Sequence, residues 1–258
     1  MFDKSFRLCQ TVSMQFREEA GQRAAPRSVW CFAALLGVAA PTAVLLAIGG
    51  GAAAPTIALG LMTAAMIGAA ISGSLRTGTL LGIANGVWLA TLSVAFDIVP
   101  IGNILLSAFA ALVASLSFAA RGALFARSSG RRGWLIAFAV ALGEAAILIS
   151  AASDPGLWPH WLLVLLPAQW ASLAFEDALA GTGLVSAAAP LAALAVTALA
   201  TLFVRQLWPR RWTYLIMFTT WLAMAALVWQ ASSPEAKRAD AEPGKSAGSS
   251  QEAGATGE

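Results

Sequence analysis

One carboxylate interrupts an otherwise apolar stretch of twenty residues, Trp134–Ser153, near its middle. Twenty residues of helix rise about 30 Å, which is also the thickness of the hydrocarbon core of a bilayer. The carboxylate, Glu144, would then lie near the midplane, where an ionised side chain costs several kcal/mol and usually has a function. The sequence therefore predicts that Glu144 binds a substrate or carries a coupling proton.

Two uncharged polar residues, Asn85 and Gln169, fall at a similar depth in other apolar stretches. Glu144 lies about 15 Å from one end of its stretch, Asn85 about 11 Å and Gln169 about 9 Å. If these stretches are neighbours, the three side chains converge on one mid-membrane site. The alternative is a structural role, in which a protonated Glu144 holds helices together through hydrogen bonds. No Lys or Arg is expected at this depth to pair with Glu144.

Three prolines, Pro41, Pro167 and Pro190, also interrupt apolar stretches. Proline has no N–H, so the carbonyl four residues earlier loses its helical partner. At membrane depth such a carbonyl needs another donor. We expect these freed carbonyls to add polar groups to the site around Glu144.

The residue inventory excludes several kinds of site. All lysines lie outside the apolar stretches, which removes the attachment point for a retinal Schiff base. His160 is the single histidine, and Cys9 and Cys31 are the only cysteines, so haem ligation by two histidines and CxxC metal sites are excluded. A glycine-rich nucleotide loop is also missing. We therefore expect no cofactor, no metal and no enzymatic activity.

The elements that must position these residues are membrane-spanning helices. Hydrophobic residues make up 59% of the 258 residues and charged residues 11%, against about 25% charged in a soluble domain. This composition predicts an all-α polytopic membrane bundle of about eight transmembrane helices. The expected spans are 30–49, 54–73, 78–97, 101–120, 134–153, 158–175, 183–204 and 211–229.

The arginines that follow residue 204 conflict with a topology of eight spans. Regular alternation places Arg76 on the cytoplasmic side, as the positive-inside rule requires. It places Arg205, Arg210 and Arg211 outside, against the same rule. It also brings Glu176 and Asp177 to the inside. The alternative is seven spans with 158–175 as a re-entrant segment, broken at Pro167, which returns the later arginines to the cytoplasm.

Small residues recur every four positions in two adjacent spans. Gly60 and Gly68 belong to one ridge, and Gly78, Gly82 and Gly86 belong to the next. Ridges of this kind let two helix backbones approach closely in lipid. They predict a tightly packed helical hairpin, of the kind described as a glycine zipper.

The chain has a polar segment at each end of the membrane domain, which we assign to 30–230. Residues 1–29 resemble a cytoplasmic amphipathic leader, with Phe2 and Phe6 near one helical face. Residues 231–258 are rich in Ala, Ser, Gly, Pro and Glu, and this composition predicts a disordered tail.

Together these features favour a small transporter or permease-like protein, multi-pass in a bacterial-type inner membrane. Glu144 would be the proton carrier or cation ligand, with Asn85 and Gln169 as orienting groups. The alternative is a non-catalytic membrane subunit or assembly factor. The expected partner is the lipid bilayer, with other membrane subunits or further copies of the chain as candidates. The net charge of +3 comes mainly from arginines near span ends, so no nucleic acid is expected.

Overall fold

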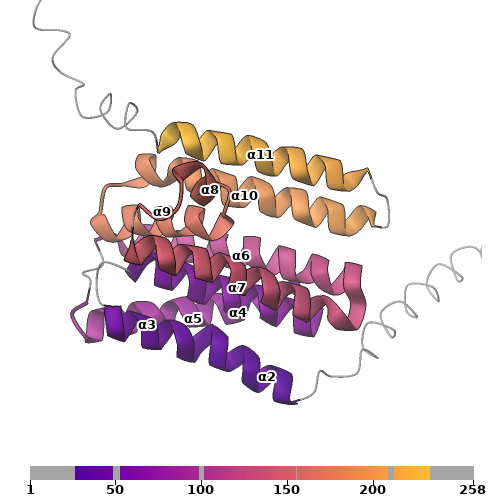
Figure 1. The fold of residues 1–258 in the computed structure, drawn as a ribbon, viewed down its shortest axis with the longest axis horizontal. Coiled ribbons are helices and arrows are strands. Elements are labelled where there is room, and N and C mark those ends of the chain that lie inside the picture. Colours follow the sequence, from indigo (N-terminus) through magenta and orange to yellow (C-terminus); the bar gives the residue numbers. More distant parts are fainter. Residues whose placement is uncertain (1–26, 49–52, 99–101, 155, 209–211, 233–258) are drawn as a thin grey trace, which may run out of the picture.

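The computed structural model describes residues 27–48, 53–98, 102–154, 156–208 and 212–232, and over these ranges it contains helices and no strands. Most of the predicted leader and nearly all of the predicted tail lie outside these ranges. The helices, in order, are α2 (Arg27–Ala34), the π-helix η1 (Leu35–Ala39), α3 (Ala40–Ile48), α4 (Ala53–Ser72), α5 (Leu75–Ala95), α6 (Ile104–Ser129), the 3₁₀-helix η3 (Gly130–Arg132), α7 (Gly133–Ser153), α8 (His160–Val164), α9 (Pro167–Ala180), α10 (Leu184–Leu207) and α11 (Thr213–Ala231) (Figure 1).

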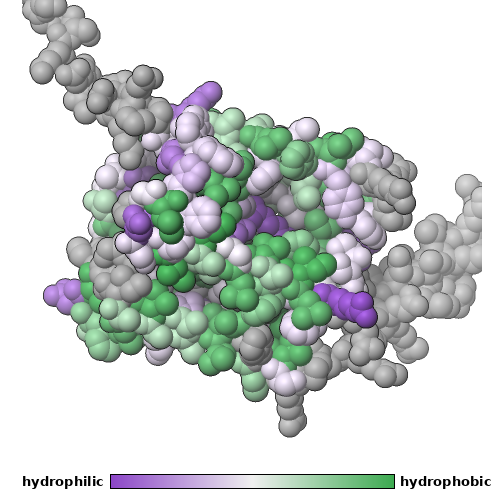
Figure 2. Space-filling view, in the orientation of Figure 1, coloured by the Kyte–Doolittle hydropathy of each residue, from purple (hydrophilic) through white to green (hydrophobic). Residues whose placement is uncertain are grey.

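Seven helices of the described chain are long and apolar enough to cross a membrane, which confirms the predicted all-α membrane bundle. The first is composite, Ser28–Ala47, and runs through α2, η1 and α3. Large hydrophobic side chains cover much of the outer surface, as expected of a protein that faces lipid (Figure 2). The preferred count of eight is corrected to seven, because the stretch 158–175 is divided between the short helix α8 and α9.

The central element of the bundle is α4. In its most apolar window 83% of the residues are buried inside the protein, against 11% for α11. It packs against α5, α6, α7, α9 and the first span. A helix that is buried on all sides needs small and apolar residues on every face. Its sequence, AAPTIALGLMTAAMIGAAIS, has them.

Helices α8 and α9 form a hairpin that enters and leaves the bundle at the same end. The chain leaves α7 at Ser153 and turns at Leu165 and Leu166 before it runs back as α9. Two backbone hydrogen bonds connect the C-terminus of α9 to the residues before α6. The Gly102 N–H donates to Leu179 O at 3.1 Å, and the Asn103 N–H donates to Ala178 O at 3.0 Å. Because α6 begins where α7 ends, 158–175 is re-entrant, as the alternative predicted.

This topology sorts the charges between the two ends of the bundle. The basic end carries Arg76, Arg127, Arg132 and Arg205, and the Arg205 Nη2 lies 3.5 Å from Gly73 O between α4 and α5. The acidic end carries Asp97, which follows α5, Asp154, which follows α7, and Asp177, which lies in the last turn of α9. The conflict over the later arginines therefore disappears for Arg205; Arg210 and Arg211 lie outside the described residues.

All five glycines of the predicted ridges lie in the contact between α4 and α5. A Cβ added at any of them would come to 3.0 Å or less from the facing helix. At Gly78 it would meet Ala65 O and Ala69 Cβ, both at 2.5 Å, and at Gly82 it would meet both Ala65 Cβ and Ser115 Oγ of α6. Glycine at these positions is what lets the helices approach so closely.

We expect Gly78→Ala to destabilise the protein by about 2 kcal/mol, because the new methyl group overlaps the backbone of α4. The matched control is Gly143→Ala on α7, where an added Cβ meets nothing within 4 Å. The control should be neutral or stabilising by up to about 1 kcal/mol through helix propensity. Melting temperatures of the two variants in the same detergent measure the difference, and equal values would contradict a tight α4–α5 contact.

Seven spans place the two ends of the membrane domain on opposite sides. We expect the basic end to face the cytoplasm. A reporter enzyme that is active only outside the cytoplasm should then be active when fused after Gln230, at the end of α11. The same reporter fused after Leu207, at the end of α10, should be silent. The reverse pattern would restore the eight-span topology.

Candidate functional site

Glu144 is 8% exposed and caps the re-entrant helix. Its Oε2 accepts a hydrogen bond of 3.0 Å from the Ala168 N–H at the start of α9. Helix α9 begins with Pro167, which has no N–H, and its N-cap, Leu166, has no side-chain acceptor. The Ala168 N–H is thus a donor without an intrahelical partner, and a carboxylate is favoured there by the helix dipole. Glu144 supplies from α7 the cap that α9 lacks.

A basic residue, Arg121, lies at nearly the same depth, which corrects the expectation that none would. The predicted span ended at 120, but the helix continues to Ser129, because no residue before Gly130 breaks it. Arg121 therefore lies about 12 Å from the end of α6 at Ser129, while Glu144 lies about 17 Å from the start of the antiparallel α7. The difference in depth is about one helical turn.

Arg121 and Glu144 attract each other electrostatically but form no direct salt bridge. The guanidinium carbon lies 5.7 Å from the centre of the Phe118 ring, a cation–π contact. Among the described residues the guanidinium has no hydrogen-bond partner. Its N–H donors are therefore available to a molecule that enters the space beside them.

That space is a cavity of about 290 Å³, lined by both charged residues. Its other lining residues are mostly apolar: Leu124, Phe125, Leu165, Leu166, Pro167, Thr197, Thr201, Met217, Phe218 and Trp221. It exists because α7 packs on α4 and α6 but makes at most marginal contact with α10 or α11. Figure 2 shows hydrophilic surface at the bottom of a hollow near the middle of the face where these helices lie (Figure 1).

The two threonines of the cavity use their hydrogens within α10. Thr197 Oγ1 donates to Ala193 O and Thr201 Oγ1 to Thr197 O, both at 2.7 Å. Arg121 and Trp221 are the only lining side chains with N–H donors. The cavity thus offers one cation, one carboxylate and an otherwise apolar wall.

Asn85 lies elsewhere and has a partner of its own. Its Nδ2 donates a hydrogen bond of 2.7 Å to Gly37 O, in the π-helix of the first span. Gly37 is the residue whose carbonyl loses its usual α-helical donor to Pro41. Asn85 therefore replaces that donor, and its own Oδ1 remains buried without a partner among the described residues. It lines a separate cavity of about 260 Å³.

Gln169 follows Ala168 in α9, next to the residue that Glu144 caps, but it does not line the Glu144 cavity. Of the three predicted site residues, only Glu144 lines it. The sequence prediction missed Arg121, Thr197, Thr201 and Trp221. A signal for Arg121 existed in the sequence, since nothing between 104 and 129 ends a helix.

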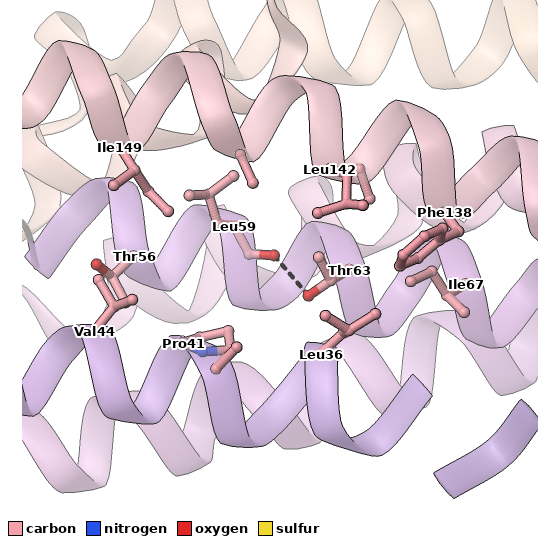
Figure 3. A pocket seen from close by; sticks show the side chains of 13 residues that line it. Leu36, Pro41, Val44, Thr56, Leu59, Thr63, Ile67, Phe138, Leu142 and Ile149 are labelled. Carbon is pink, nitrogen blue, oxygen red and sulfur yellow. Dashed lines mark hydrogen bonds between the residues drawn. The ribbon is translucent and has the colours of Figure 1, made fainter. Parts of the chain in front are cut away.

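A further pocket lies between the first span, α4 and α7 (Figure 3). Its volume is about 160 Å³, and Pro41, Leu59 and Leu142 are among the side chains that line it. The Thr63 hydroxyl at its wall donates to Leu59 O at 2.8 Å. This pocket presents no charged group, so the Arg121–Glu144 cavity is the better candidate site.

Comparison of the chain with protein-family models, with curated proteins and with solved structures gives no match. Function is therefore inferred from the cavity itself. Its distinguishing features are a carboxylate that caps a re-entrant helix and an arginine whose donors are unused.

We expect Glu144→Leu to destabilise the start of α9, because the Ala168 N–H then has no acceptor at membrane depth, at a cost of about 1–3 kcal/mol. Glu144→Gln keeps an acceptor oxygen and should stay close to the wild type. Hydrogen exchange of the Ala168 amide in nanodiscs measures this directly. Equal protection in the leucine and glutamine variants would show that Glu144 does not hold the helix.

Proposed function

We propose that this multi-pass membrane protein is a small transporter or permease-like protein of a bacterial-type inner membrane, with no enzymatic activity. Its substrate would bind in the Arg121–Glu144 cavity, and Glu144 would carry the coupling proton. The observation that supports this most is the position of Glu144, which at once faces the cavity and holds the re-entrant helix.

The two oxygens of the Glu144 carboxylate can serve two roles: one caps α9, and the other is available to a proton. Oε2 accepts from the Ala168 N–H, whereas Oε1 has no hydrogen-bond partner among the described residues. A proton that enters the cavity can bind Oε1 without breaking the contact to α9. Charged side chains inside membrane proteins commonly lie on such substrate or proton pathways.

Protonation would also change how firmly α9 is held. A neutral acid keeps the hydrogen bond to Ala168 but loses its attraction to the positive end of the helix. The turn at Leu165 and Leu166, which lines the cavity, would then be freer to move. The other end of α9 stays fixed by its backbone bonds to Gly102 and Asn103. In many secondary transporters, discontinuous helices that end at mid-depth form the substrate and coupling-ion sites.

The chemistry of the cavity favours binding over catalysis. Its lining side chains include neither His nor Cys, and Glu144 is its only carboxylate. Its described lining therefore has neither a nucleophile paired with a histidine nor a pair of carboxylates.

The proposal is tested in proteoliposomes that enclose a pH-sensitive dye, with a panel of small organic anions, cations and neutral compounds outside. A transported substrate should produce proton movement with the wild type and with the control variant Asp177→Asn at the acidic end. Glu144→Gln should fold but lose at least about 99% of the rate, since it cannot release a proton.

The competing role, a membrane subunit or assembly factor, makes the opposite prediction. Glu144→Gln would then retain full biological function, and a stoichiometric partner would be recovered with the protein from native membranes. That pair of results would overturn the transport function.

A further inference from the structure

We propose that the Arg121–Glu144 cavity binds a monovalent organic anion with a small apolar body, and that each anion enters together with one proton. This inference rests on the proposed transport function and adds its substrate class and its coupling. The anion would pair with Arg121, and the proton would convert the Glu144 carboxylate to the neutral acid.

Arg121 is the recognition group. A guanidinium carries five N–H donors in a planar fork that matches carboxylate, sulfonate or phosphate oxygens. None of these donors has a partner among the described residues, although the side chain lies inside the bundle. Phe118 beneath it satisfies only one face of the cation. A bound anion would supply the missing hydrogen bonds.

The apolar side chains of the cavity wall determine which kind of body the anion can have. Leu124 and Phe125 of α6, with Met217, Phe218 and Trp221 of α11, offer apolar surface. The volume of about 290 Å³ is near the lower end of the range, about 300–1,000 Å³, of sites that bind small molecules. An anion with a short alkyl or aromatic body fits this combination better than an inorganic ion.

The charge balance of the site links the anion to a proton. Without ligand, Arg121 and ionised Glu144 sum to zero, whereas an added monovalent anion leaves a net charge of minus one. A net charge buried at membrane depth is costly. One proton on Glu144 restores neutrality, so the loaded and empty cavities are both neutral.

No other ionisable group is placed to take this role. Arg121 is the other charged side chain of the cavity lining. Helix α4, which packs on α7, has no ionisable residue. The remaining ionisable residues on the neighbouring elements lie toward the ends of the bundle: Arg127 on α6, Arg131 and Arg132 on η3, His160 on α8, Glu176 and Asp177 on α9, Arg205 on α10 and Tyr214 on α11.

Hexanesulfonate is a suitable probe, because its strongly acidic headgroup stays ionised and any proton taken up belongs to the protein. Calorimetric titration of the full chain in nanodiscs, in buffers of different ionisation enthalpy, counts the protons bound. We expect about one proton per anion. The Kd should rise about tenfold per pH unit where Glu144 is ionised in the empty protein. Hexyltrimethylammonium and hexanol should not compete.

Two variants separate the roles of the charged residues. Glu144→Gln imitates the protonated acid, so it should bind the probe without proton uptake and with a Kd independent of pH. Arg121→Gln should weaken binding at least about tenfold, while Arg127→Gln, on the exposed end of the same helix, should leave it unchanged. If Arg121→Gln fails to fold, Arg121→Lys should bind several-fold more weakly and keep the proton uptake.

The inference is overturned if hexanesulfonate does not bind, binds without proton uptake, or binds equally well to Arg121→Gln. The experiments also separate a wrong substrate class from a wrong transport function. Glu144-dependent proton movement with a cation or a neutral compound would preserve transport and exclude the anion class. Proton-linked binding of hexanesulfonate, without movement of any organic anion across the liposome membrane, would preserve the site and exclude transport.

Discussion

Backbone N–H and C=O groups cannot remain unpaired at membrane depth, and the main polar contacts of this bundle follow from that constraint. Pro41 deprives the Gly37 carbonyl of its α-helical donor, and Asn85 provides one. Pro167 begins a helix in the middle of the protein, and Glu144 accepts from its first free N–H. Proline removes the donor in the first case and the start of a helix leaves a donor over in the second, and in both a side chain from another helix pairs with the backbone group. Each of these side chains keeps an oxygen without a partner among the described residues, but that of Glu144 belongs to a carboxylate that lines the Arg121 cavity.

The cavity beside Glu144 results from uneven packing around α4. Glycine and alanine bring α5 and α6 so close to α4 that an added methyl group would overlap them. The α10–α11 hairpin instead packs on α6 and α9 and hardly meets α7. The floor of the resulting space is α6, which carries Arg121. The charge of Arg121 is stabilised there by the Phe118 ring and by its attraction to Glu144.

Local patterns predicted most of the fold. The lengths of the apolar stretches predicted the membrane-spanning helices, and the spacing of the glycines predicted the contact between α4 and α5. The distribution of arginine favoured the re-entrant alternative at 158–175. Two of the errors at the candidate site have clear physical causes. Arg121 was missed because a span was cut to the thickness of the hydrocarbon core, whereas α6 continues to Ser129. Asn85 was placed with Glu144 because depth along a helix says nothing about which neighbour its side chain faces.

The re-entrant hairpin also dictates an order of assembly. Helix α9 packs on α4 and α6, which are synthesised before it, and on α10, which is synthesised after it. Its free N–H at Ala168 has no acceptor until α7 is in place. Its contacts with α4, α6 and α7 can form as soon as α9 has been synthesised, whereas its contact with α10 has to follow the insertion of that helix. The final packing of this hairpin therefore depends on a helix that follows it in the chain as well as on helices that precede it.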